Sequence, residues 1–60
     1  MDEYESLAVY DGSGGAPERF EECRATIAAN GVLIVVAGKE SHIWNRDAWK
    51  KVEAAPLVRV

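Results

Sequence analysis

The feature that most constrains the fold is one unbroken apolar run, Val32-Leu33-Ile34-Val35-Val36-Ala37, near the middle of the chain. The run is rich in β-branched residues and too short for a core helix, so it predicts a strand that is buried on both faces. The rest of the 60 residues must pack around it. A single domain of this length buries only about 60% of the surface that its unfolded chain exposes, so we expect a partner subunit to add stability.

The chain before this run predicts a strand, a turn and a helix. Residues 1–5 are polar and acidic and predict a flexible lead-in to a single domain over residues 6–60. Residues 6–10 show the alternation of a short strand, and the glycines that follow predict a turn. The expected amphipathic helix is indicated by a start at Pro17, an apolar stripe at Phe20, Cys23 and Ile27, and a stop at Gly31.

The chain after the run predicts a hairpin, a second helix and a last strand. Residues 37–40 are expected to form the hairpin connection, and residues 41–44 to return as an antiparallel strand. Asn45 is a good N-cap for a helix that Pro56 would stop, with a last strand at residues 57–60. Trp44 and Trp49 then occupy the two positions of a hydrophobic staple.

The expected order, β-α-β-β-α-β, is typical of an α+β fold, a ferredoxin-like (split βαβ) sheet with two helices on one face. That topology places the apolar run at a sheet edge, which a second copy of the chain would cover in a homodimer. The alternative is a short βαβ unit, with the first two strands adjacent and parallel, plus a hairpin and a helix.

The charge and the cysteine content limit the classes of function. Ten acidic and seven basic side chains give a net charge of −3, which disfavours nucleic acid and favours a protein partner with a basic surface. Cys23 and His42 are single, so no intrachain disulfide, metal site or cofactor is expected, and the setting should be reducing and cytoplasmic. We expect no signal peptide, no membrane span and no catalytic site.

The glycine turn is the first candidate site. Between a strand and a helix, Gly12-Ser13-Gly14-Gly15 would present backbone N–H groups to an anion. With Asp11-Gly12-Ser13 as its turn, the stretch from Leu7 to Val36 is similar to the opening of the universal stress protein family. The resemblance implies a strand, an amphipathic helix and a second apolar strand, but the nucleotide-binding members need a later glycine-rich motif that this chain lacks. A plain tight turn is therefore the favoured interpretation.

The first functional hypothesis is a non-enzymatic protein interaction module. Such a small acidic inhibitor or adaptor would cover a basic surface, as a phage or mobile-element antagonist of a host nucleic-acid enzyme would do. The candidate partner-binding residues are the acidic helix face and three residues beyond it: Glu18, Glu21, Glu22, Asp11, Trp44 and Arg46.

The alternative hypothesis is a small nucleic-acid-binding protein. A hairpin followed by a helix, from Gly38 to Trp49, resembles the wing and following helix of excisionase-type winged-helix DNA binders. The resemblance implies a basic row along the hairpin and the second helix, formed by Lys39, Arg46, Lys50 and Lys51.

Overall fold

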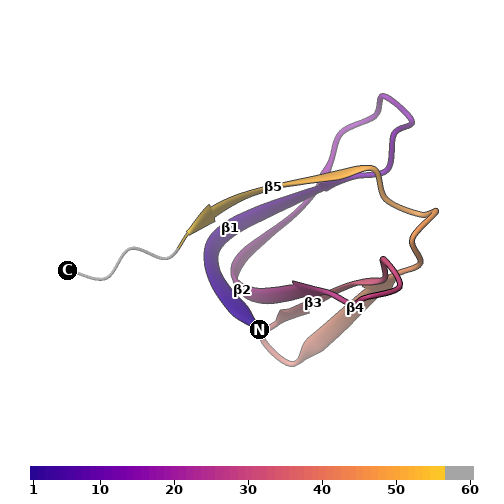
Figure 1. The fold of residues 1–60 in the computed structure, drawn as a ribbon. Coiled ribbons are helices and arrows are strands. Elements are labelled where there is room, and N and C mark those ends of the chain that lie inside the picture. The colour runs from indigo at the N-terminus through magenta and orange to yellow at the C-terminus, as the bar shows by residue number, and fades with distance from the viewer. Residues whose placement is uncertain (57–60) are drawn as a thin grey trace.

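The computed structural model describes residues 1–56, which form one antiparallel sheet (Figure 1). Its strands are β1 (Asp2–Tyr10), β2 (Glu18–Ile27), β3 (Leu33–Ala37), β4 (Glu40–Trp44) and β5 (Lys51–Pro56). Their order across the sheet is β4-β3-β2-β1-β5, so the first four strands form a meander and the last returns beside the first.

The prediction of an α+β, ferredoxin-like fold is wrong, because the described residues contain five strands and no helix. The alternative βαβ unit is wrong too, since β1 and β2 pair in antiparallel orientation. The segment expected to be a flexible lead-in lies almost entirely in β1, where Asp2 is paired with Ala25. The strand expected at residues 57–60 lies outside the described residues.

The first predicted helix is strand β2, and a local backbone feature explains the error. Phe20 and Cys23 are both buried, three residues apart, as on a helix. In β2 this spacing arises because Glu22 adopts a left-handed conformation (φ 49°), so that two exposed residues separate two buried ones. Ile27, the third member of the expected stripe, is 55% exposed. The kink in the strand thus gives buried residues the three-residue spacing that is typical of a helix.

The second predicted helix is a single turn followed by β5. The Ala48 N–H donates to the Asn45 carbonyl over 2.8 Å, so Asn45, the expected N-cap, is followed by one turn and not by a helix. The Lys50 N–H then donates to the Tyr10 carbonyl over 2.7 Å and leads the chain in beside β1. In β5 the side chain of Val52 packs against the core between two exposed neighbours, which is the alternation of a strand.

The predicted hairpin is confirmed. Gly38 and Lys39 form its turn, Gly38 with φ +61°, and Ala37 pairs with Glu40. The apolar run supplies β3, which lies inside the sheet between β2 and β4. β3 is therefore not a sheet edge, which removes the reason for a second copy to cover it.

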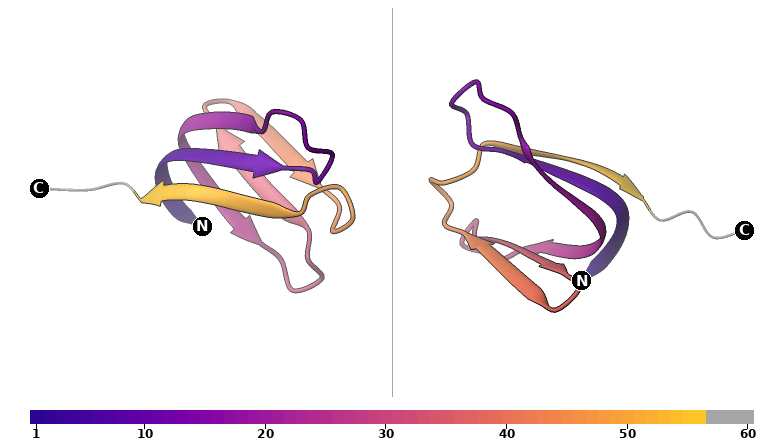
Figure 2. Two further views of the ribbon diagram at one scale, coloured as in Figure 1. Left: turned by 90° about the horizontal axis from the view of Figure 1, so that it is seen from above. Right: turned by 180° about the vertical axis from the view of Figure 1, so that it is seen from behind.

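The sheet bends sharply, so that its two halves face each other across the core (Figures 1 and 2). One half contains β5 with the end of β1 and the start of β2, and the other contains β3 and β4 with the end of β2. On the inner side Leu7 lies opposite Phe20, and three residues along each strand Tyr4 lies opposite Cys23. Residues that are three apart point to opposite sides of an ordinary strand. These residues nevertheless point to the same side, because both strands bend at Glu5 and Glu22. The inner sides enclose the buried core cluster of Leu7, Val9, Phe20, Cys23, Ala25, Leu33 and Val35.

Two contacts tie the loops and the half-sheets together. Phe20 from one half packs against His42 and Trp44 of β4, with ring centroids 4.8 and 5.8 Å apart. The Trp49 indole N–H donates to the Gly31 carbonyl over 3.0 Å, which joins the β4–β5 connection to the β2–β3 connection. Gly31 has φ +86°, and a Cβ there would lie 2.9 Å from the Arg46 Cβ.

Candidate functional site

An apolar patch covers the outer side of β3 and β4. Leu33 and Val35 point into the core, so the alternate residues Ile34 and Val36 point outward. Ile43 of β4 lies directly opposite Ile34 and is 66% exposed. We call Ile34, Val36 and Ile43 the outer apolar patch.

The surroundings of the outer apolar patch are polar. Val36 lies between Arg24 of β2 and Ser41 of β4, and Thr26 of β2 lies opposite Ile34. The solvated face of an antiparallel sheet is ordinarily polar, so an apolar strip with a polar rim is the informative departure. A surface of this kind suits contact with another macromolecule, with one basic side chain, Arg24, at its border.

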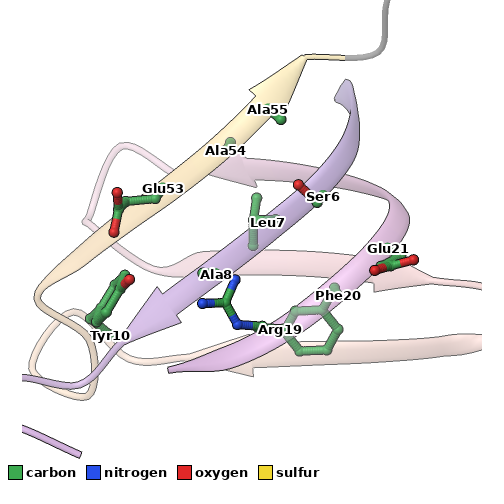
Figure 3. Close-up of a pocket in the computed structure, with 10 residues that line it drawn as sticks. All are labelled: Ser6, Leu7, Ala8, Tyr10, Arg19, Phe20, Glu21, Glu53, Ala54 and Ala55. Atoms are coloured by element: carbon green, nitrogen blue, oxygen red, sulfur yellow. The ribbon is translucent and has the colours of Figure 1, made fainter. Parts of the chain in front are cut away.

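A concave surface lies on the outer side of β5, β1 and β2 (Figure 3). Its volume is about 310 Å³, and Ala8, only 5% exposed, lies at its centre with Arg19 beside it. We call it the Ala8 groove. Its lining includes the small residues Ala54, Ala55 and Ser6, and the polar Tyr10, Arg19, Glu21 and Glu53.

The polar and charged side chains at one end of the Ala8 groove interact with one another. Hydrogen bonding between the Tyr10 hydroxyl and the Glu53 carboxylate raises the pKa of Tyr10 and lowers that of Glu53. Lys51 adds to the lowering at Glu53, with its Nζ 3.8 Å from the carboxylate and 4.7 Å from the centre of the Tyr10 ring. These groups stabilise the surface of the sheet, and none is left as an unpaired acid or base for chemistry.

The sequence-predicted acidic residues lie at separate places. Glu18 and Glu21 are exposed on β2, opposite Val9 and Ser6. Glu22 is at the bend, between Glu21 and Cys23, which pair with Ser6 and Tyr4 of β1. No shared helix face joins these residues, because the described chain has no helix.

Asp11 organises the loop between β1 and β2. Its Oδ1 accepts the Ser13 N–H over 2.8 Å, and hydrogen bonds from Ser13 hold the pKa of Asp11 below its usual value. The Ser13 Oγ in turn accepts the Gly15 N–H over 3.2 Å. Two of the N–H groups expected to face an anion are thus already hydrogen-bonded, and a strand follows instead of a helix N-terminus.

The remaining sequence candidates, Trp44 and Arg46, lie at the same end of β4. Trp44 is half-buried against the core, and the staple with Trp49 does not form, since no helix begins at Asn45. Arg46 is exposed just beyond β4.

The thiol and the imidazole do not form a catalytic pair. Cys23 is 2% exposed, and burial raises the pKa of its thiol. His42 instead lies 3.3 Å from the Glu40 carboxylate and stacks with Trp44.

The outer apolar patch is the surface that the sequence interpretation missed. A run of six apolar residues was expected to be buried on both faces, but β4 and β2 cover only its edges, and the outer side of β3 stays uncovered. The signal available was Ile43, an isoleucine between histidine and tryptophan in a short strand.

Among residues 1–56 no group of three or more His, Cys, Asp or Glu side chains is placed to hold a metal ion. In the same residues no helix has the length and apolar character that a membrane crossing requires. Comparison with protein-family profiles, with curated proteins and with solved structures gives no significant match.

Proposed function

We propose that the chain is a non-enzymatic protein-binding module, a small acidic inhibitor or adaptor, which holds its partner with the outer apolar patch. The observation that carries this proposal is the exposure of Ile43 beside Ile34 and Val36 on a face where water would favour polar residues. The partner is a protein with an apolar contact surface. Burying three such side chains supplies the non-directional part of the affinity.

The net charge suggests what surrounds that contact on the partner. With a net charge of −3, the chain is steered toward a basic surface. The phosphate-binding surface of a nucleic-acid enzyme is one surface of this charge. Association should therefore slow as the salt concentration rises, while the dissociation rate changes little.

The nucleic-acid alternative receives less support. Its winged helix requires a helix after the hairpin, and residues 45–50 form one turn. The four basic residues also fail to form a row, because Lys39 and Arg46 lie beyond opposite ends of β4.

The proposal is tested with a photo-crosslinking side chain placed at position 36, on the outer face and away from the sheet edge, and at Ala55 on the outer side of the other half. A partner crosslinked from cell extract at position 36 but not at position 55 is then purified. Its affinity should fall at least tenfold, about 1.4 kcal/mol, with Val36→Lys, and stay unchanged with Ala55→Lys. Equal crosslinking at both positions, or equal affinity of both variants, would contradict the proposal.

A further inference from the structure

The two edges of the sheet differ in how well they are protected. Among the described residues β4 and β5 each have one neighbouring strand, so each leaves a row of backbone groups unpaired. β5 carries Lys51, Glu53 and Pro56, and charged side chains and proline are the usual means of preventing edge pairing. β4, with the sequence Glu-Ser-His-Ile-Trp, has neither lysine nor proline, and its one glutamate, Glu40, stands at the end next to the turn. The unprotected edge is therefore that of β4.

The unpaired backbone groups of β4 belong to Ser41 and Ile43. The hairpin has a two-residue turn, which is closed by the pair Ala37 and Glu40, and hydrogen-bonded pairs alternate from there along the ladder. His42 and Trp44 are then the residues that bond to β3. The N–H and C=O groups of Ser41 and Ile43 point to the free edge, beside the exposed Ile43 side chain.

The segment from Glu40 to Arg46 complements itself when two copies run antiparallel. It has an acid at its start, an isoleucine at its centre and a base at its end. With Ile43 opposite Ile43 of a second copy, Glu40 of each copy comes next to the turn that follows β4 of the other, where Arg46 is exposed. Opposite charges brought together in this way are favourable.

The competing register is less well matched. Centred on His42, it places Glu40 opposite Trp44 and Ser41 opposite Ile43, so that charged or polar groups face apolar ones. It also leaves Arg46 outside the pairing. Arg46 has no ion pair within residues 1–56, so its guanidinium is available to a second copy.

We propose that β4 pairs antiparallel with β4 of a second copy of this chain, about a two-fold axis at Ile43, with Glu40 and Arg46 paired at both ends. The pairing makes one continuous sheet from two copies and places the two outer apolar patches side by side. Because a single edge buries less surface than the ~800 Å² per subunit of a standard interface, the dimer should be weak and concentration-dependent.

The first test measures solution mass by analytical ultracentrifugation from about 10 μM to about 1 mM, a range suited to a weak interface. The mass should rise from 6.6 kDa toward twice that value. Glu40→Arg alone and Arg46→Glu alone should each weaken association about tenfold, since each acts at both ends of the pairing. The double variant should recover the wild-type constant to within about threefold. Circular dichroism and tryptophan fluorescence verify that each variant is folded.

The second test does not depend on charge. Ile43→Cys places two thiols at the two-fold axis, where a hydrogen-bonded pair has a Cα separation of about 5.5 Å, within the range of a disulfide. Mild oxidation should give a covalent dimer, whereas Ala55→Cys at the other edge and the wild type, with its buried Cys23, should form no disulfide-linked dimer.

Several results would overturn the self-association. They are a mass of 6.6 kDa at every concentration, charge variants that associate as the wild type does, or equal crosslinking of the two cysteine variants. The outcome is separable from that for the proposed partner surface. Val36→Lys should weaken partner binding and leave the dimer intact, while Glu40→Arg should do the reverse.

Discussion

At the scale of single residues, hydrogen bonds between neighbouring side chains set the acid–base properties of the Ala8 groove. Tyr10 is half-buried and Glu53 is exposed, and their hydrogen bonding moves the two pKa values in opposite directions. A carboxylate whose pKa is lowered on folding adds stability at pH values above its unfolded pKa, and this stability is lost as the pH falls through the folded value. Glu53 thus favours the folded state at neutral pH and ceases to do so in acid.

Tyr10→Phe should raise the pKa of Glu53 toward its ordinary value of 4.5, because the largest of the three interactions that lower it is removed, while those with Lys51 and Arg19 remain. The measurement is a titration of the Glu53 carboxyl carbon by NMR in both proteins. Asp11, whose pKa is lowered by Ser13, serves as the control within each sample and should not move. If Glu53 titrated identically in the two proteins, the hydrogen bond with Tyr10 would not be the main cause of its lowered pKa.

At the scale of strands, the left-handed residue at the bend decides the shape of β2. Glu22 is the one non-glycine residue with positive φ in the described chain, a conformation that costs a side chain of this kind roughly 1 kcal/mol or more. The bend thus carries backbone strain, and the core enclosed by the two half-sheets compensates for it.

Glu22→Gly should leave the free energy of unfolding unchanged or raise it by about 0.5–1 kcal/mol, because glycine adopts positive φ without strain. Glu21→Gly, one residue earlier in ordinary extended backbone, should lower it by about 1 kcal/mol. Urea denaturation followed by tryptophan fluorescence provides both values. Equal losses in the two variants would mean that residue 22 is not strained.

The same bend explains how far the sequence could predict the fold. The strand at β3 and its hairpin could be predicted, because an unbroken β-branched run and a Gly-Lys turn are local signals. β2 could not, since the spacing of Phe20 and Cys23 matches a helix unless the conformation of Glu22 is known. β5 could not be predicted either, because Asn45 indicated the start of a helix, whereas a single turn follows it.

The candidate site was even less predictable. Whether Ile34 and Val36 face a core or water depends on which elements cover the outer side of β3, and that is decided by the two strands mistaken for helices. The acidic residues Glu18, Glu21 and Glu22 were grouped only by an assumed helix.

At the scale of the whole molecule, the small core relies on contacts between the two half-sheets. Phe20 is 9% exposed and joins β2 to β4 through His42 and Trp44. A domain of this size has only about 3–5 kcal/mol of stability. Losing one such side chain is therefore comparable to losing the fold.

Phe20→Ala should cost about 3–4 kcal/mol and leave the chain largely unfolded at 25 °C, whereas Ile43→Ala, at a site that is 66% exposed, should cost less than about 1 kcal/mol. Both are measured by circular dichroism at a concentration low enough to keep the chain monomeric. Similar losses in the two variants would show that Ile43 is as important to the monomer as the core is.

The bend also limits how a gene for this protein can change in length. A codon gained or lost at Glu22 alone would move every later residue of β2 by one position relative to β1, and would turn Cys23 and Ala25 out of the core. The loop from Asp11 to Ala16 stands outside the sheet and is exposed throughout, so extra codons there leave both registers intact. Over evolutionary time, insertions and deletions should accumulate in that loop, while the distance between Phe20 and Cys23 stays fixed.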